Sequence, residues 1–105
     1  MNGFVYLIGE CNNKNIYKIG LTKKFDVNER LKELQTGNSN DLYIKETFKT
    51  NKPFKLESML HRHYNKSNER GEWFELTENE VKDFKNVCMK YQRIIDSLKD
   101  NPFFK

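Results

Sequence analysis

The sequence has few cysteines and no long hydrophobic run. Only Cys11 and Cys88 are present among 105 residues, far apart and without the paired spacing of a zinc site or a disulfide framework. We therefore expect two free thiols in a reducing compartment. The apolar run from Phe4 to Ile8 is shorter than a signal-peptide core, and no other stretch is long enough to span a bilayer. The expectation is a soluble, cytoplasmic protein without a membrane partner.

The chain also lacks a strong charge bias, internal repeats and low-complexity segments. Its 19 basic and 15 acidic residues leave a formal charge of +4. Such a mild positive field attracts a polyanion such as nucleic acid but is too small to identify a partner. The eight Phe, five Tyr and single Trp supply the apolar surface of a compact globule. We expect one domain, residues 1–105.

The first part of the chain has the pattern of a β-hairpin followed by a helix. Two short β-forming runs, residues 3–9 and 16–20, flank an asparagine-rich turn that needs no glycine to reverse direction. Asp26 followed by Glu29 resembles a capping box, and apolar residues then recur at helical spacing. These signals predict a helix over about 27–36.

The second part predicts one more long strand and two more helices. Residues 42–49 alternate apolar and polar, which indicates a third strand with one buried face. A helix is expected from about Pro53 to Tyr64, with proline in its first turn. After a short extended segment, residues 72–76, a capping box predicts a long amphipathic helix from Thr77 to about Lys99, ended by Asn101-Pro102.

Several side chains in these elements are candidates for chemistry on a phosphate. Helical spacing places Glu57 and His61 together on the flank of the second helix, and it places Arg30 at the border of the apolar stripe of the first. Strand alternation places Lys18 on the face opposite Tyr17. Taken one at a time, each also fits an ordinary surface or packing residue.

Together with Tyr6, these residues match what hydrolysis of a phosphodiester requires. A carboxylate such as Glu57 holds Mg²⁺ against the phosphate, and cations such as Lys18 and Arg30 offset the charge that develops there. A phenol positions or deprotonates the attacking water, and a histidine near the carboxylate orients it, acts through water or assists proton transfer.

The pattern of VYLI, a turn, YKIG, a helical arginine and a later helical glutamate resembles the GIY-YIG nuclease superfamily over residues 3–76. The runs YKIGLTKKFDVNERLKELQTGN, LESMLHRHY and GEWFEL are similar to its branch from phages and large DNA viruses. The resemblance implies an α+β fold, a three-stranded antiparallel sheet flanked by helices. Residues 77–105 then form a helical extension that includes the long C-terminal helix.

Site residues follow from this resemblance position by position. Tyr6 stands at the tyrosine of the first motif, Arg30 at the helical arginine and Glu57 at the metal-binding glutamate. Lys18 occupies the usual tyrosine position of the second motif, with Tyr17 one residue early and on the opposite face. The late asparagine of the family corresponds to Asn68 or Asn65, and the spacing does not choose between them.

The resulting hypothesis is a metal-dependent endonuclease that hydrolyses DNA, with RNA left open as a substrate. Glu57 binds Mg²⁺ or Mn²⁺, Tyr6 is the general base, and Lys18 and Arg30 stabilise phosphate charge. One alternative is a nucleic-acid-binding module of the same fold that does not cleave. Another is a protein-interaction domain built on the apolar stripe of the last helix, which contains Val81, Phe84, Val87, Cys88, Tyr91 and Ile95.

Overall fold

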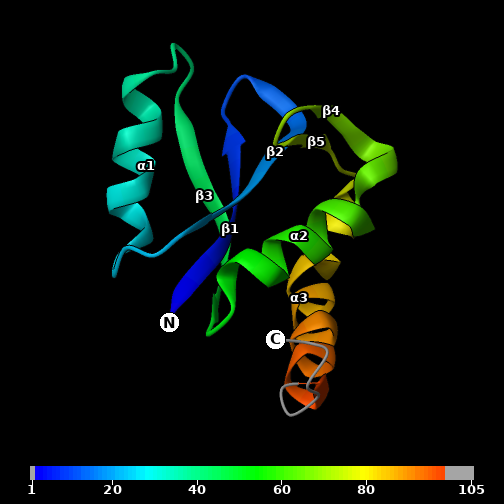
Figure 1. The fold of residues 1–105 in the computed structure, drawn as a ribbon. Helices are drawn as coiled ribbons and strands as arrows, with labels where there is room; N and C mark the ends of the chain where they lie inside the picture. Colours follow the sequence, from blue (N-terminus) through cyan, green and yellow to red (C-terminus); the bar gives the residue numbers. More distant parts are fainter. Residues whose placement is uncertain (1, 99–105) are drawn as a thin grey trace.

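A computed structural model describes residues 2–98, which form an α+β fold with one antiparallel sheet (Figure 1). In chain order the elements are β1 (Gly3–Glu10), β2 (Asn13–Thr22), α1 (Val27–Thr36), β3 (Leu42–Thr50), α2 (Pro53–His63), the short 3-10 helix η1 (Asn65–Ser67), β4 (Asn68–Arg70), β5 (Trp73–Glu75) and α3 (Glu78–Leu98). The expected α+β class and the long C-terminal helix are confirmed. The predicted helix stop at 101–102 lies outside the described residues.

The sheet contains more strands than the three expected. Its order is β3-β1-β2-β5-β4, so the three long strands lie together and two short strands extend the β2 edge. The additional pairing is brief: Ile16, Tyr17 and Lys18 of β2 face Glu75, Phe74 and Trp73 of β5. The extended segment expected near residues 72–76 therefore joins the sheet, and part of the polar stretch before it folds back as β4.

Local signals in the sequence account for the turns and helix starts. Asn15 adopts a left-handed conformation with φ 70°, as the asparagine-rich hairpin allows. The Asp26 side chain accepts the Asn28 backbone N–H at 2.9 Å and caps α1. At α3, Thr77 and Glu80 exchange backbone-to-side-chain hydrogen bonds of 2.9 and 3.1 Å, which confirms that capping box.

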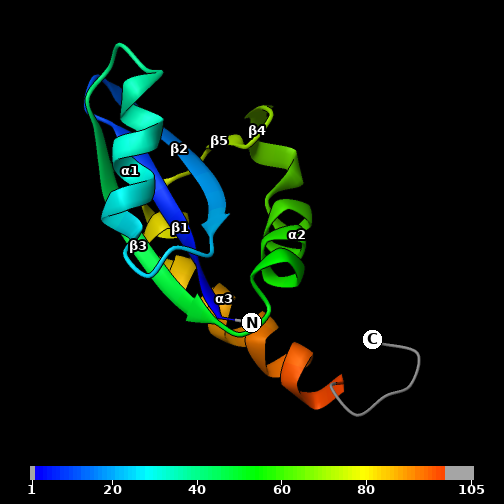
Figure 2. The same ribbon diagram turned by 60° about the vertical axis from the view of Figure 1, so that its left-hand side comes forward.

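The sheet separates two apolar layers (Figures 1 and 2). Helix α1 covers one face, where Val27 packs with Tyr6, Ile8 and Leu42. Helices α2 and α3 cover the other face, and their residues form the larger core with the alternate side chains of β1 and β2. Each of these two strands thus has both faces covered, which is why β1 reads as a continuous apolar run.

The prediction that β3 has a single buried face was wrong. Leu42 and Ile44 belong to the α1 layer, whereas Phe48 packs on the α2 and α3 side. The cause is a bulge: Leu7 pairs with Glu46 but Ile8 pairs with Ile44, so one residue of β3 is skipped. An extra residue reverses the side-chain alternation beyond it.

The apolar stripe of α3 is part of the core. Phe84, Cys88 and Ile95 are buried in the larger cluster, and Val81 and Tyr91 pack against it. Thr50 of β3 also donates a 2.6 Å hydrogen bond to Gln92 of α3. The stripe proposed for a protein-interaction domain is thus occupied within the chain. Among residues 2–98, no helix combines the length and apolar character needed to cross a membrane.

Candidate active site

The tyrosine of the first motif lies across a glycine of the second. Tyr6 of β1 pairs with Gly20 of β2, and a Cβ added at Gly20 would lie 2.5 Å from the Tyr6 hydroxyl oxygen. The ring therefore extends over β2 toward the outer edge of that strand, and only a glycine leaves room for it. Tyr6 is 1% exposed. Burial raises the pKa of its phenol above the ordinary value, and a hydrogen bond with Arg30 opposes this shift.

Lys18 lies on the same face of the sheet as Tyr6. Its ammonium is 3.4 Å from a carboxylate oxygen of Glu72 and 5.6 Å from the centre of the Trp73 ring. The Lys18 side chain is only 13% exposed, whereas the Glu72 side chain is 42% exposed, so the lysine is shielded while its carboxylate partner is partly in water. Tyr17 faces the opposite layer, where it packs against the larger core, as strand alternation predicts. Of Tyr17 and Lys18, only Lys18 therefore faces the site.

Arg30 reaches the site from α1. Its charge favours the ionised form of the Tyr6 phenol and so lowers the pKa of that group, and its guanidinium is 3.1 Å from Glu33 one turn on. Glu33 also forms an ion pair with Lys24 at 3.2 Å. Arg30 thus acts electrostatically on the tyrosine and remains about one-third exposed, where a phosphate has access to it.

At Ile19 the outer edge of β2 stops pairing with the β5 segment and begins to contact α2. The Ile19 N–H donates to the backbone carbonyl of Glu72 at 3.0 Å, and there the pairing with the β5 segment ends. The Ile19 carbonyl lies 2.8 Å from Nε2 of His61 on α2. Because a carbonyl only accepts hydrogen bonds, Nε2 carries the proton and Nδ1 retains a lone pair when the ring is neutral. His61 thus docks α2 against this strand edge.

Glu57 lies one turn before His61, and Glu72 comes from the segment that leads into β5. One ligand atom each of Glu57, His61 and Glu72 lies within 4.8 Å of the others. Burial, and then a hydrogen bond and repulsion from the Glu72 carboxyl, raise the pKa of Glu57 to about 7. Two carboxyls this close share a proton at neutral pH or share a cation.

This donor set fits a divalent metal. Two carboxylates are the oxygen ligands that Mg²⁺ and Mn²⁺ prefer, and an imidazole nitrogen suits Mn²⁺ better than Mg²⁺. The bond from His61 to the Ile19 carbonyl fixes ring orientation in the way that ligating histidines are usually held. Glu57, expected as the metal ligand, therefore has two neighbours able to complete a site.

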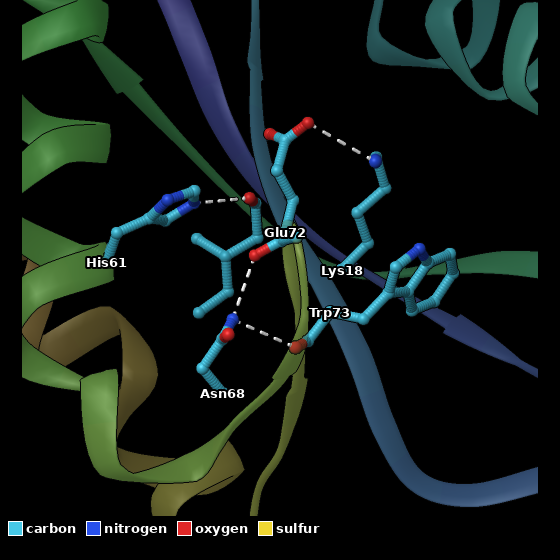
Figure 3. A network of polar contacts seen from close by, with 7 residues as sticks. Lys18, His61, Asn68, Glu72 and Trp73 are labelled. Carbon is cyan, nitrogen blue, oxygen red and sulfur yellow. Dashed lines mark hydrogen bonds and ion pairs between the residues drawn. The ribbon is translucent and has the colours of Figure 1, made fainter.

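Glu72 and its supporting turn are what the sequence did not reveal. The Asn68 side chain donates to the carbonyls of Gly71 and Trp73, at 2.8 and 3.3 Å, and so closes the turn that carries Glu72 (Figure 3). Gly71 sits in this turn with φ 57°, which favours glycine. Both asparagines considered are exposed, but Asn68 closes the turn that carries Glu72, whereas Asn65 lies in η1 before that turn.

All five residues expected at the site gather around this edge of β2. Tyr6, Lys18 and Arg30 approach from the α1 face, and Glu57 and His61 approach from α2 at the open part of the edge. The negative charges of Glu57 and Glu72 both raise the pKa of the Tyr6 phenol. The residues on the α1 face and those from α2 therefore interact electrostatically. A phenol, two cations and a carboxylate pair with histidine converge within a single site.

Comparison with known proteins gives one match. No curated protein matches the chain, and neither does any solved structure. A family model, the T5orf172 domain, matches residues 3–89, from the start of β1 into the second half of α3. This domain class is associated with GIY-YIG-like nucleases of phages. The match covers most of the chain, and the protein belongs to the T5orf172 domain family.

Proposed function

We propose that the protein is a metal-dependent endonuclease of the GIY-YIG type that hydrolyses phosphodiester bonds in DNA. The observation that supports this most is the approach of Glu57, His61 and Glu72 to within 4.8 Å of one another beside the Tyr6 and Lys18 face. A carboxylate cluster without cations, or cations without carboxylates, would serve binding. Both together suit the charge changes of phosphate hydrolysis.

Each side chain takes a distinct role in this proposal. Glu57 and Glu72 hold Mg²⁺ or Mn²⁺, which supplies Lewis-acid polarisation of the scissile phosphate when bound. His61 orients this pair, directly or through water. Arg30 contacts the phosphate with its exposed edge, and Lys18 shifts from Glu72 toward the phosphate as negative charge grows there.

Tyr6 is the proposed general base, and its environment sets a condition on that role. The buried phenol has a raised pKa and is therefore protonated in the free protein at neutral pH. Arg30 is the group that favours the phenolate, since its hydrogen bond lowers the pKa. Water activation by Tyr6 consequently predicts a cleavage rate that increases from pH 7 to pH 9. A rate independent of pH in this interval points to a phenol that only positions the water.

The experiment is incubation of supercoiled plasmid with the native chain in Mg²⁺ or Mn²⁺, compared with Glu57→Gln and Glu72→Gln. Native protein should convert the plasmid to nicked or linear forms. Each substitution should slow this at least about 100-fold, in line with the loss of a metal ligand or its orienting partner. Glutamine keeps the shape of the side chain, and circular dichroism checks that both variants fold.

The runner-up is a binding module of the same fold, and the same experiment separates it. Equal nicking by native protein and Glu57→Gln, or no nicking in either metal, contradicts the endonuclease. Retained DNA binding with no cleavage favours the module. The exposed Arg30 edge and the formal charge of +4 suit both readings, so the metal dependence decides between them.

A further inference from the structure

An aromatic ring projects into solvent near the proposed active site. Phe25, in the loop between β2 and α1, is 97% exposed, and Phe54, in the first turn of α2, is 55% exposed. Phenylalanine has no polar atom that gains from exposure, so a ring held almost wholly in water marks a contact surface better than an exposed tyrosine does. The β2–α1 loop and the first turn of α2, which carry these two residues, lie toward the same end of the sheet (Figure 2).

The surroundings of Phe25 are basic. A hollow of about 410 Å³ is lined by Phe4 and Phe25 and by three lysines, Lys23, Lys24 and Lys49. Its remaining lining residues, Asn2 and Gly3, carry no carboxylate. Aromatic faces beside ammonium groups are what a nucleotide requires, because its base stacks on a ring and its phosphate pairs with cations.

A neighbouring hollow is lined by Arg30 of the proposed active site. This second hollow, of about 440 Å³, shares Lys23 and Lys24 with the first. The Lys23 ammonium lies 4.9 Å from the centre of the Phe54 ring, one helical turn before Glu57. A strand whose phosphate contacts Arg30 can therefore place its neighbouring nucleotide against Phe25.

Building on the proposed function, we propose that Phe25 with Lys23 and Lys24 binds an unpaired nucleotide of the DNA strand next to the cleavage point. The base stacks on Phe25, and the lysines hold the adjoining phosphates. In intact duplex DNA both faces of each base are already stacked, so the ring finds a partner only where bases are unpaired. The preferred substrate is then DNA with extruded bases, flaps or single-stranded segments. Stacking is tolerant of sequence.

The charge of the first hollow favours a polyanion as its occupant. Three lysines and no carboxylate in the first hollow complement a polyanion and oppose a basic partner. Lys24 is paired with Glu33, which also holds Arg30, so this carboxylate stands between two cations that a phosphate would contact. A surface pair of this kind exchanges for phosphate at little cost.

The test measures binding without cleavage. Fluorescence anisotropy in metal-free buffer, with Glu57→Gln as background, compares a labelled duplex carrying one extruded base, the same duplex fully paired, and the single strand. Phe25→Ala should weaken binding to the first and third probes about tenfold and leave the paired duplex unchanged. Phe25→Trp should preserve binding, and its added fluorescence should be quenched when the base stacks.

Controls separate stacking from general changes. Met89→Ala removes another exposed apolar side chain, 45% exposed on α3, and should leave all three affinities unchanged. Replacement of Lys23 and Lys24 by glutamine should reduce the slope of log affinity against log salt by about 0.7 for each lost phosphate contact on a single strand. Replacement of Lys82 and Lys90 on α3 by glutamine should leave this slope unchanged.

Two results overturn the proposal. One is that Phe25→Ala weakens binding to the paired and unpaired probes equally, or does not weaken binding to any probe. The other is a change in self-association of Phe25→Ala by sedimentation with no change in DNA binding, which assigns the ring to a protein contact. The binding measurement is independent of catalysis. Binding that depends on Phe25, without plasmid cleavage, contradicts only the proposed endonuclease activity. Plasmid cleavage without binding that depends on Phe25 contradicts only the proposed nucleotide site.

Discussion

At the scale of single residues, the Glu57 carboxyl is placed beside a second carboxyl in a partly buried site. Its pKa is raised from an ordinary 4.5 to about 7, first by burial and then by Glu72. Between these two pH values the folded protein retains a proton that the unfolded chain releases. Folding stability therefore falls as pH rises from about 4.5 to about 7, and this loss persists above that range.

Replacement of Glu57 by glutamine should consequently stabilise the metal-free protein while it slows cleavage at least about 100-fold. The side chain is partly hydrated, so we expect about 1 kcal/mol, which raises Tm by roughly 4–8 °C in a domain of this size at pH 8. The gain should vanish near pH 4.5. Thermal scans in EDTA at the two pH values measure it. A lower Tm at pH 8 would contradict the carboxyl repulsion.

Replacement of Gly20 tests where the Tyr6 ring is placed. A methyl group there meets the Tyr6 hydroxyl at 2.5 Å and must displace the ring from the β2 edge. Gly20→Ala should destabilise by about 1–3 kcal/mol, as overpacking does, and lower cleavage by at least tenfold at saturating metal.

Gly37 offers a matched control for this prediction. An added Cβ at Gly37 meets no atom within 4 Å, and its φ is −96°, which alanine adopts freely. Gly37→Ala should leave cleavage unchanged. If Gly20→Ala were equally harmless in denaturant melts and plasmid assays, the ring of Tyr6 would not be held where the structure has it.

At the scale of elements, the short β4–β5 turn has a larger role than its length suggests. Asn68 closes it through two carbonyls, and this fixes the segment that presents Glu72 to Lys18 and Glu57. Asn68→Ala should reduce cleavage about 10–100-fold, as loss of support around a metal site does, with a smaller effect on Tm. Added Mn²⁺ should recover part of the rate.

Asn65→Ala is the natural comparison, because Asn65 is exposed like Asn68 but lies in η1, before the turn. Plasmid cleavage and Mn²⁺ titration of both variants decide which asparagine acts at the site. A similar loss from Asn65→Ala would assign the effect to the whole 64–71 connection and not to the closure of the turn.

Elements with local signals were predictable from the sequence. The caps at Asp26 and Thr77 begin helices where expected, since each bond is made within three residues of the cap. Alternation also placed Lys18 and Tyr17 correctly on opposite faces of β2. Periodicity and capping depend on neighbours in sequence, so a single chain is enough to read them.

Features that depend on distant partners were not predictable. The β3 bulge arises from its pairing with Leu7 and Ile8, and the alternating letters of residues 42–49 carry no sign of it. Glu72 gains its role from Lys18, 54 positions away, and from Glu57 on another element. A glutamate before a short strand has no periodicity to distinguish it. Such a residue is found only when tertiary contacts are known.

At the scale of the whole molecule, the proposed metal site predicts that metal binding and folding stability are coupled. The two carboxyls come from α2 and from the segment before β5, so a cation between them joins the helix layer to the sheet edge. A ligand that binds only the folded state stabilises it by about 2.7 kcal/mol at 100 times its Kd. The same ion should therefore support catalysis and raise Tm.

The proton on Glu57 makes this coupling dependent on pH. With a pKa of about 7, Glu57 is mostly ionised at pH 8 and mostly protonated at pH 6. Metal must displace the proton at pH 6, so its affinity should fall about tenfold, and its stabilisation should shrink by about 1.4 kcal/mol. Thermal scans with Mn²⁺ titrated at both pH values should show the larger rise in Tm at pH 8, and Glu57→Gln should show no rise at either. A metal-induced rise of equal size at both pH values, or one retained in Glu57→Gln, would place the ion elsewhere on the protein.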